Sequence, residues 1–436
     1  MTKVLLITPE YPPGGAVGAA RTVAFEKYLP EFGFQTAVLT LRSAGALPTD
    51  SERHVYRAPD AGSLYLPLTR RFLPASRHYA TQSAPGNASG LRRALAGGLS
   101  RLRRLMLEWM APDLQITWLP GALWMGWRAI QRERPALLYS SSPPETAHLV
   151  AGLLAGQARL PWVADFRDGW LFESLKPALR RAGWRRQLET RLEGWAVRRA
   201  AAIVAVSAPI TDYFRAAYSD EATHKFHSLP NGYDPPDWTA VTPAPRPPGR
   251  MRWVHTGAFG MSGATRRPDA FLQALACLPV ECRRSLEVVF VGKLTEEEKR
   301  LISRADAGDC LHCVGPVSKT ESLGYQLSAD ALLLIAGQDK SVTTSKLYEY
   351  LYARRPILAL AAPDGAAGQI VSQTEAGEVV PPIDVEAIAL AVRRWMERWQ
   401  TGQLRVQPRG LEQYERRVLT RQLAEIFTGV LSQARP

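Results

Sequence analysis

The sequence predicts an α/β protein built from two doubly wound, Rossmann-like domains in tandem. Short apolar runs, typical of buried parallel strands, alternate along the chain with stretches whose apolar residues recur at helical spacing. One segment rich in Pro and Gly, residues 230–250, interrupts this alternation, and 436 residues are enough for two separate cores. We therefore expect a domain over 1–240 and a second over 241–409, facing each other across a cleft.

The first predicted strand, at 4–7, leads through a glycine turn into a helix predicted at 19–32. Such a turn presents backbone N–H groups at a helix N-terminus, where a phosphate can bind, so Gly14 and Gly15 are candidate binding residues. A dinucleotide cofactor is not indicated, because the glycines lack the G-x-G-x-x-G spacing and the second predicted strand ends without an acidic residue. A tight turn without a ligand is the alternative.

The remaining elements of the first domain follow a stretch at 58–90 that lacks periodicity and is predicted to be an insertion. The predicted strands are 136–143, 162–166, 201–207 and 226–229, and the predicted helices are 124–134, one from 145, a long basic helix at 175–200, and 209–218.

The second domain repeats the alternation. Its predicted strands are 251–257, 286–292, 310–315, 331–336, 356–360 and 377–380, with helices beginning near 268, 295, 318, 345, 366 and 385. The last helix, within 410–436, carries an apolar face with Leu423 and Phe427, and no strand follows it. We expect this helix to pack back on the first domain.

The charge is basic and uneven. The net charge is +13, and residues 1–240 carry 29 Lys and Arg against 20 Asp and Glu. Two predicted helices, at 91–110 and 175–200, interleave Arg with Leu, Trp and Met, which favours an anionic membrane surface as a partner. Arginines that are simply solvated are the alternative. No nucleic-acid-binding motif accompanies the charge, so nucleic acid is not expected to be a partner.

The expected compartment is the cytoplasm, with the protein peripheral at the inner face of the membrane if the basic helices bind lipid. No apolar run approaches the ~18 residues of a membrane span, and the N-terminus does not resemble a signal peptide. Four cysteines could supply zinc ligands by spacing, but they lie in apolar runs, so we expect reduced core thiols and no metal site. They are Cys277, Cys282, Cys310 and Cys313.

Candidate site residues lie where predicted strands end, because ligands of open α/β sheets bind beyond the carboxyl ends of the strands. In the first domain these include Asp165, Arg167 and Asp168. In the second, Thr344 and Ser345 precede a helix whose N–H groups point to the site.

Lys346 lies in the first turn of that helix, where a cation is unfavourable unless an anion is near, and Glu349 lies three residues later on nearly the same face. A phosphate-bearing, hydroxyl-rich ligand would satisfy both. A capped helix with an exposed ion pair is the alternative.

Four motifs resemble the retaining glycosyltransferases of family 4, which have the GT-B fold: the glycine turn, "NGYD" at 231–234, "TSKLYEYLYARRPILAL" at 344–360, and "GEVVPPIDVEAIALAV" at 377–392. The resemblance spans nearly the whole chain. It implies a transferase that moves a sugar from a nucleotide-sugar donor to a glycan or polyisoprenyl-linked acceptor, as in bacterial surface-polysaccharide synthesis. No cofactor is implied.

The resemblance also implies roles for single residues. Glu349 would bind the ribose, and the amides of Thr344, Ser345 and Lys346 would face the sugar and the diphosphate. Arg266 or Arg267 would neutralise the diphosphate, and the backbone near Val317 would read the base. Gly14 and Gly15 would lie against the diphosphate and the acceptor.

Two positions depart from the family pattern. Ser341 stands where many members have a second glutamate, and Arg167 stands where many have a histidine. We expect Asp165 or Asp168 to hold Arg167, which would orient the donor or the acceptor.

Catalysis would need no protein nucleophile and no metal, because amides and cations stabilise the leaving diphosphate. A nucleotide-sugar 2-epimerase and a non-catalytic scaffold of a glycan assembly complex are the alternatives.

Overall fold

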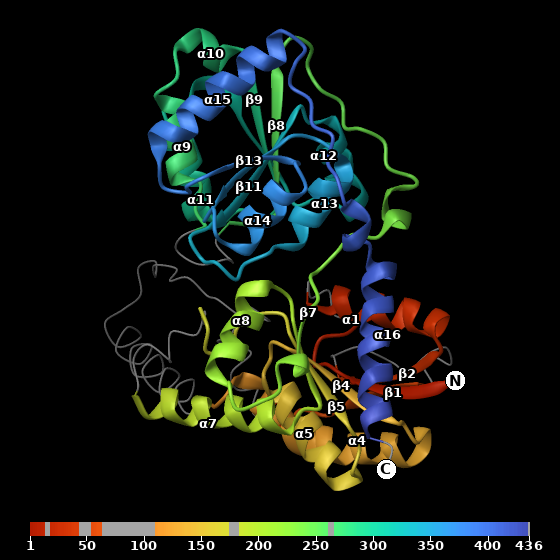
Figure 1. The fold of residues 1–436 in the computed structure, drawn as a ribbon. Coiled ribbons are helices and arrows are strands. Elements are labelled where there is room, and N and C mark those ends of the chain that lie inside the picture. Colours follow the sequence, from red (N-terminus) through yellow and green to blue (C-terminus); the bar gives the residue numbers. More distant parts are fainter. Residues whose placement is uncertain (14–17, 43–53, 63–109, 174–182, 260–265, 435–436) are drawn as a thin grey trace, which may run out of the picture. The chain divides into compact units, whose positions relative to one another are not determined.

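The computed structural model describes residues 1–13, 18–42, 54–62, 110–173, 183–259 and 266–434 of the chain. The chain divides into two compact units (Figure 1). Unit 1 comprises Met1–Val206, Ile210–Leu229 and Thr420–Pro436, and unit 2 comprises Ser207–Pro209 and Pro230–Leu419.

Unit 1 is built on a parallel sheet. Its strands are β1 (Thr2–Ile7), β2 (Phe34–Leu41), β3 (Val55–Ala58), β4 (Leu137–Ser142), β5 (Trp162–Phe166), β6 (Ala202–Ala205) and β7 (Phe226–Ser228), in the spatial order β3-β2-β1-β4-β5-β6-β7. The order reverses between β1 and β4, where Val4 pairs with Leu137. Such a reversal opens a crevice at the carboxyl ends of the two strands.

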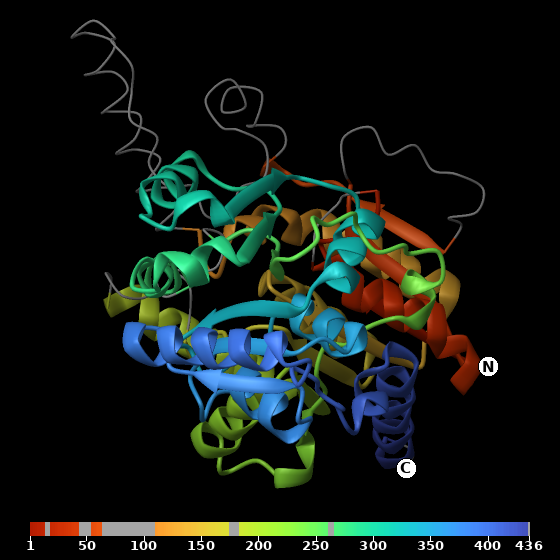
Figure 2. The same cartoon turned by 90° about the horizontal axis from the view of Figure 1, so that it is seen from above.

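Helices cover both faces of this sheet (Figures 1 and 2). They are α1 (Ala19–Tyr28), α4 (Leu119–Glu133), α5 (Thr146–Ala158), α7 (Gly183–Arg199), α8 (Ala208–Ala217) and α16 (Arg416–Gln433). Leu5, Leu39 and Leu138 pack against α4 and α5 in one apolar core. Because strand side chains alternate between faces, Tyr139 points the other way, where it meets Phe25 of α1 and Phe427 of α16.

Unit 2 is also built on a parallel sheet. Its strands are β8 (Met251–Thr256), β9 (Leu286–Val291), β10 (Leu311–Gly315), β11 (Ala331–Gly337), β12 (Ile357–Ala361) and β13 (Gly377–Val380), in the spatial order β10-β9-β8-β11-β12-β13. The order reverses between β8 and β11, where Ala331 pairs with Trp253.

The helices of unit 2 form two layers. They are α9 (Asp269–Ala276), α10 (Val280–Arg284), α11 (Glu296–Arg304), α12 (Lys319–Ser328), α13 (Ser345–Ala353), α14 (Ala366–Gln373) and α15 (Val385–Gln400). On one face of the sheet Trp253 packs on Phe271 of α9 and Trp395 of α15. On the other face Val254 joins Leu347 of α13 in a separate core.

The predicted fold is confirmed: the protein has two parallel, doubly wound sheets, and α16 returns to unit 1. The ring of Phe427 lies 5.5 Å from that of Phe34. Some predictions fall on residues outside the described ranges, namely most of the insertion at 58–90, nearly all of the basic segment 91–110, and 175–182.

Other parts of the prediction were incomplete or wrong. The strand β3 and the short helix α10 were not predicted. The segment 230–250 is not only a linker, because Tyr233 and Trp238 are buried in unit 2, each against the ring of Tyr352. Of the four cysteines, Cys310 is the one that is buried, as expected of a core thiol. Cys277, at the end of α9, and Cys313 are exposed, and Cys282 is half-buried.

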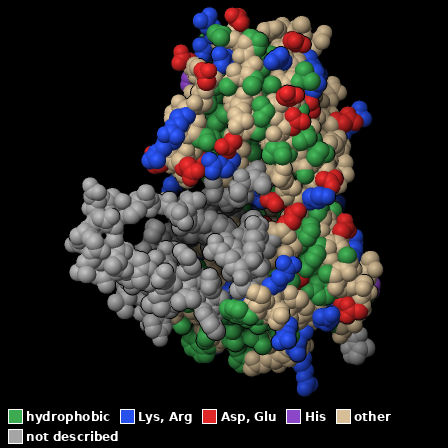
Figure 3. Space-filling model, turned by 90° about the vertical axis from the view of Figure 1, so that its left-hand side faces the viewer, with side chains coloured by type: hydrophobic (Ala, Val, Ile, Leu, Met, Phe, Trp, Pro, Cys, Tyr) green, Lys and Arg blue, Asp and Glu red, His purple; other side chains and the backbone are tan. Residues whose placement is uncertain are grey.

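Charged side chains of both signs are interspersed over the face of unit 2 that Figure 3 shows. Within the described ranges, no helix is both long enough and apolar enough to cross a membrane. The same part of the chain contains no cluster of His, Cys, Asp and Glu suited to a metal ion.

Candidate functional site

The N-terminus of α13 lies beyond the carboxyl end of β11 in unit 2. Thr344 is the N-cap residue, but its side chain makes no capping hydrogen bond with any described residue. The hydroxyl oxygens of Thr343 and Thr344 are buried, and neither has a hydrogen-bond partner in the described structure. Buried hydroxyls are normally paired, so these two are suited to a polar ligand at this helix N-terminus.

Lys346 lies in the first turn of α13, with its ammonium directed at β8. Its Nζ lies 3.3 Å from Nε2 of His255. Burial lowers the pKa of Lys346 to about 8; Glu349 acts in the raising direction and Arg266 in the lowering one. The group therefore remains mostly charged at neutral pH, and a bound anion would stabilise that charge.

Gly257 leaves the space that Lys346 occupies. A Cβ at Gly257 would lie 3.0 Å from Nζ of Lys346, and its φ of +97° is one that other residues rarely adopt. The backbone of Gly257 is in turn packed against Gly292, where a Cβ would lie 3.0 Å from Gly257 Cα. The two glycines let the ends of β8 and β9 approach each other beside the lysine.

The two predicted arginines differ. Arg266 is buried, and its Nη2 lies 3.5 Å from a carboxylate oxygen of Asp339. Arg267 is exposed and donates to Asp269 and to Glu297, each at 3.0 Å. Because Arg266 acts on the pKa of Lys346, it is the arginine that belongs to this cationic group.

Glu349 lies one turn further along α13. Its carboxylate accepts a hydrogen bond from Gln326 at 2.9 Å and forms an ion pair with Lys319. Lys319 opens α12 and follows the loop that contains Val317. The structure therefore brings the predicted ribose-binding carboxylate and the predicted base-reading loop together. The alternative, an exposed ion pair between Lys346 and Glu349, is not what the structure shows, because Glu349 pairs with Lys319.

Asp165 in unit 1 has a different role from the one predicted. It is fully buried, and Arg21 donates to both of its carboxylate oxygens at 2.9 Å. The hydroxyls of Tyr139 and Ser141 donate to it at 2.7 and 3.0 Å. Burial raises the pKa of Tyr139 well above its usual value, and the negative charge of Asp165 is the second cause of this increase. A carboxylate with these partners organises the core of unit 1 and is not open to a substrate.

Arg167 is held by the strand ends and by Glu10. It donates to the carbonyl oxygens of Ser142, at 3.1 Å, and Pro143, and its Nη2 lies 3.5 Å from Glu10 Oε2. The expectation that Asp165 or Asp168 holds it is wrong, because Asp165 is bound by Arg21, Tyr139 and Ser141 and the carboxylate in contact with Arg167 is that of Glu10.

Asp168 is exposed, and Gly14 and Gly15 lie outside the described residues. Gly18, in the same turn, is described. A Cβ there would lie 1.8 Å from Glu10 Oε2 and 2.0 Å from Arg167 Nη1. The turn therefore runs directly against the Glu10–Arg167 pair, and a larger residue at this position would displace the ends of both side chains.

Sequence reasoning missed His255 and Gln326 in unit 2, and Glu10 and Arg21 in unit 1. One signal was present: a histidine lies within the predicted strand 251–257, two residues before Gly257. The partners of Asp165 and Glu349 carried no local signal, because they come from elements distant in the sequence.

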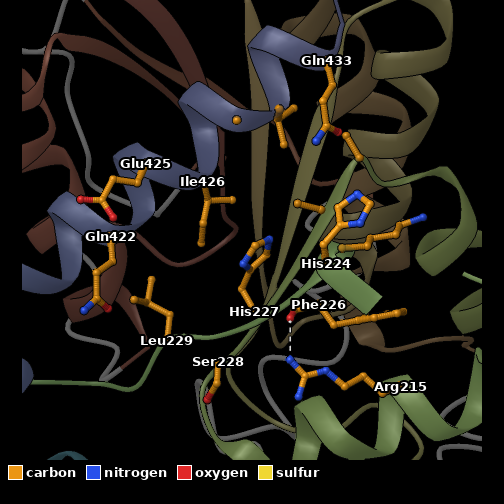
Figure 4. A pocket seen from close by; sticks show the side chains of 15 residues that line it. Arg215, His224, Phe226, His227, Ser228, Leu229, Gln422, Glu425, Ile426 and Gln433 are labelled. Carbon is orange, nitrogen blue, oxygen red and sulfur yellow. Dashed lines mark hydrogen bonds between the residues drawn. The ribbon is translucent and has the colours of Figure 1, made fainter. Parts of the chain in front are cut away.

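A hollow of about 620 Å³ lies in unit 1, between β7 and α16. Figure 4 shows the side chains that line it. Its lining includes His224, His227 and Glu425, and Arg215 donates to the carbonyl of Phe226 at 3.1 Å. None of the predicted site residues that the structure describes lines this hollow. It is therefore separate from the cationic group of unit 2.

Two family models together match most of the chain. Residues 14–232 match a family model described as "Glycosyl transferase 4-like domain", and residues 261–409 match one described as "Glycosyl transferases group 1". No curated protein matches the chain by sequence.

Among solved structures, sucrose-phosphate synthase from Thermosynechococcus elongatus is similar at a TM-score of 0.66 with 15% identity, over 99% of this chain and 100% of that one. HepE from Anabaena in complex with UDP has a TM-score of 0.61 and 15% identity, over 98% and 100%. WaaG, a glycosyltransferase involved in lipopolysaccharide biosynthesis, has a TM-score of 0.56 and 14% identity, over 98% and 100%. These likenesses show the GT-B fold.

Proposed function

From the premise that this chain belongs to the glycosyltransferases of the 4-like and group 1 families, we propose that it transfers a sugar, with retention of configuration, from a nucleotide-diphosphate donor. The acceptor in this proposal is a glycan or a polyisoprenyl-linked saccharide. Unit 2 binds the donor and unit 1 binds the acceptor.

The observation that carries the proposal is the cationic group at the N-terminus of α13. Lys346 and Arg266 lie beside a helix N-terminus and two buried hydroxyls that lack partners among the described residues. A pyrophosphate supplies what this arrangement lacks, namely negative charge and acceptor oxygens. HepE, a neighbour in fold, binds UDP, which supports a nucleoside diphosphate as the ligand class.

The remaining predicted residues take the other parts of the donor. In this proposal Glu349 accepts hydrogen bonds from the ribose hydroxyls, and for this it exchanges its partner Lys319 for the ligand. The backbone near Val317 contacts the base. The backbone of Thr344 and Ser345 faces the sugar and the diphosphate.

Catalysis then follows from charge. As the glycosyl–phosphate bond breaks, negative charge grows on the diphosphate, and the fixed amides and cations stabilise it more strongly in the transition state than in the substrate. The leaving phosphate oxygen takes the acceptor proton on the same face of the sugar. Arg167, held by Glu10, orients the acceptor or the donor, and no metal ion is needed.

We place the reaction in bacterial cell-surface polysaccharide or glycoconjugate synthesis, in the cytoplasm and peripheral to the inner face of the membrane. The fold neighbour WaaG is a glycosyltransferase of lipopolysaccharide biosynthesis, which supports this class of pathway.

A donor screen tests the proposal. Purified protein is incubated with several nucleotide sugars, with and without saccharide acceptors and with and without a chelator, and the released nucleotide is measured. Acceptor-dependent release that survives the chelator is the expected result. An epimerised nucleotide sugar would indicate the 2-epimerase instead, and the absence of any donor binding would indicate a scaffold.

The Glu349→Ala variant tests the assignment of the ribose contact. We expect it to weaken nucleoside diphosphate binding by roughly tenfold or more, because a charge-assisted hydrogen bond is lost. Calorimetric titration measures the affinity. The matched control is Glu296→Ala, which removes an exposed carboxylate that pairs with Lys299 in the same unit and should leave the affinity unchanged. Equal affinities in both variants would contradict the assignment.

A further inference from the structure

We propose that His255 is a positioning residue that aims the ammonium group of Lys346 at the donor pyrophosphate by accepting a hydrogen bond from it at Nε2. The inference rests on the proposed function and names a further residue of the same site. It depends on three features of the imidazole: its tautomer, its fixed orientation and its place opposite Lys346.

The tautomer follows from the hydrogen bonds. Nδ1 of His255 lies 2.9 Å from the carbonyl oxygen of Leu333, and a carbonyl oxygen can only accept, so Nδ1 carries the proton. A neutral ring then has a lone pair at Nε2, where Lys346 Nζ lies at 3.3 Å. Burial, and after it the charge of Lys346, holds the pKa of His255 well below its usual 6.5, so the ring stays neutral.

The ring cannot turn away from Lys346. His255 is buried within β8, and the ring of Phe259 stacks on it at 4.4 Å with an interplanar angle of 18°. Phe290 of β9 meets it edge-on at 6.2 Å. The bond to β11 through Leu333 and these two rings fix the direction of the Nε2 lone pair.

The position of Lys346 makes such an acceptor useful. Two charged groups influence the pKa of this ammonium: Glu349, on its own helix, raises it, and Arg266, in the loop before α9, lowers it. Neutral His255 faces it from β8. A cation in the first turn of a helix is unfavourable, so without a partner it would turn outward or lose its proton. An ammonium has three donors, and with one directed to His255 the other two remain for phosphate oxygens.

A pH dependence follows. The pKa of Lys346 is lowered from its usual 10.5 to about 8, so the ammonium is present below that pH and is lost as the pH rises through it. Nucleoside diphosphate binding, which needs the charged form, should therefore weaken above about pH 8. Removing the acceptor at position 255 destabilises the ammonium further and moves the weakening to lower pH.

The test measures UDP, ADP and GDP affinity by calorimetry between about pH 6 and pH 9.5. His255→Asn can still donate to Leu333 but is too short to reach Lys346, and His255→Leu is an apolar second variant in case the first does not fold. Both are expected to bind roughly tenfold more weakly at pH 7, with the midpoint of the pH profile shifted downward. His255→Gln restores a carbonyl acceptor near the place of Nε2 and should return the midpoint toward that of the unmodified protein.

Controls separate the possible outcomes. Lys346→Met should bind weakly with no fall near pH 8, and His227→Asn in unit 1 should keep the profile of the unmodified protein. A merely structural role of His255 would lower the affinity equally at every pH with an unshifted midpoint, and that result overturns the inference alone. Absence of nucleoside diphosphate binding in the unmodified protein overturns the proposed function and the inference with it.

Discussion

Asp165 is a carboxylate that stabilises the core of unit 1 and does not face a ligand site. Four hydrogen bonds from Arg21, Tyr139 and Ser141 converge on it, and its exposed fraction is 0%. The charge of a buried carboxylate is tolerated only while such partners compensate for lost hydration. The Arg21–Asp165 pair therefore joins α1 to β5, because each group depends on the other.

Replacement of this carboxylate should be costly for stability. We expect Asp165→Asn to lower the free energy of unfolding by about 3 kcal/mol or more, because it leaves Arg21 buried without its counter-charge. Denaturant unfolding measures the change. Asp220→Asn is the matched control, since Asp220 pairs with Arg198 at an exposed site, and its effect should stay within about 0.5 kcal/mol. Equal costs in the two variants would contradict a structural role for Asp165.

The direction of Asp165 could have been predicted, whereas its partners could not. Ala164 and Phe166 both pack in the core beneath α4 and α5, so strand alternation sends Asp165 to the opposite face. Nothing local indicates that Arg21, 144 residues away, meets it there. In unit 2, by contrast, the three-residue spacing of Lys346 and Glu349 predicted that both lie near the N-terminus of one helix. Because ligands of open α/β sheets bind beyond the carboxyl ends of the strands, this helix end was predicted to be part of the site.

At the level of elements, prediction succeeded where sequence signals are strong. Ser318 and Thr295 each open a helix with a reciprocal capping box, and both helices had been predicted to begin there. β3 and α10 were missed because their sequences, VYRA and VECRR, are short and contain charged residues that interrupt an apolar run. The core contribution of Trp238 was missed because Pro-rich composition indicates a linker.

The terminal helix α16 provides the element-scale prediction. Phe427 is fully buried, and its ring meets both Phe34 of β2 and Tyr139 of β4. We expect Phe427→Ala to destabilise unit 1 by about 3–5 kcal/mol, because it leaves a cavity between helix and sheet. Ile426→Ala on the same helix is the control, since Ile426 lines the hollow of Figure 4 and is only half-buried. Thermal or denaturant unfolding should show a much larger loss of stability for Phe427→Ala than for the control. A larger loss for the control would contradict the packing of α16.

For the molecule as a whole, charge distribution is the property that links the chain to a larger partner. Residues 1–240 hold 29 Lys and Arg against 20 Asp and Glu, whereas the rest of the chain holds 25 against 21. One of the two basic segments, 91–110, lies almost entirely outside the described residues, so its role is inferred from its sequence. Basic residues interleaved with Leu, Met and Trp suit an interface that offers both anionic headgroups and apolar depth.

This distribution predicts binding to anionic vesicles. The protein should co-sediment with phosphatidylglycerol-containing vesicles at about 0.1 M salt, remain in solution with pure phosphatidylcholine, and dissociate near 0.5 M salt as the charges are screened.

Replacing Arg101, Arg103 and Arg104 by Gln should weaken binding roughly a hundredfold or more, since each cation near the surface contributes about 1 kcal/mol. The control triple removes the same charge from the exposed surface of α11 and should bind like the unmodified protein. It consists of Lys299→Gln, Arg300→Gln and Arg304→Gln. Equal weakening in both triples would show that net charge acts without a defined surface, and would contradict a membrane-binding role for 91–110.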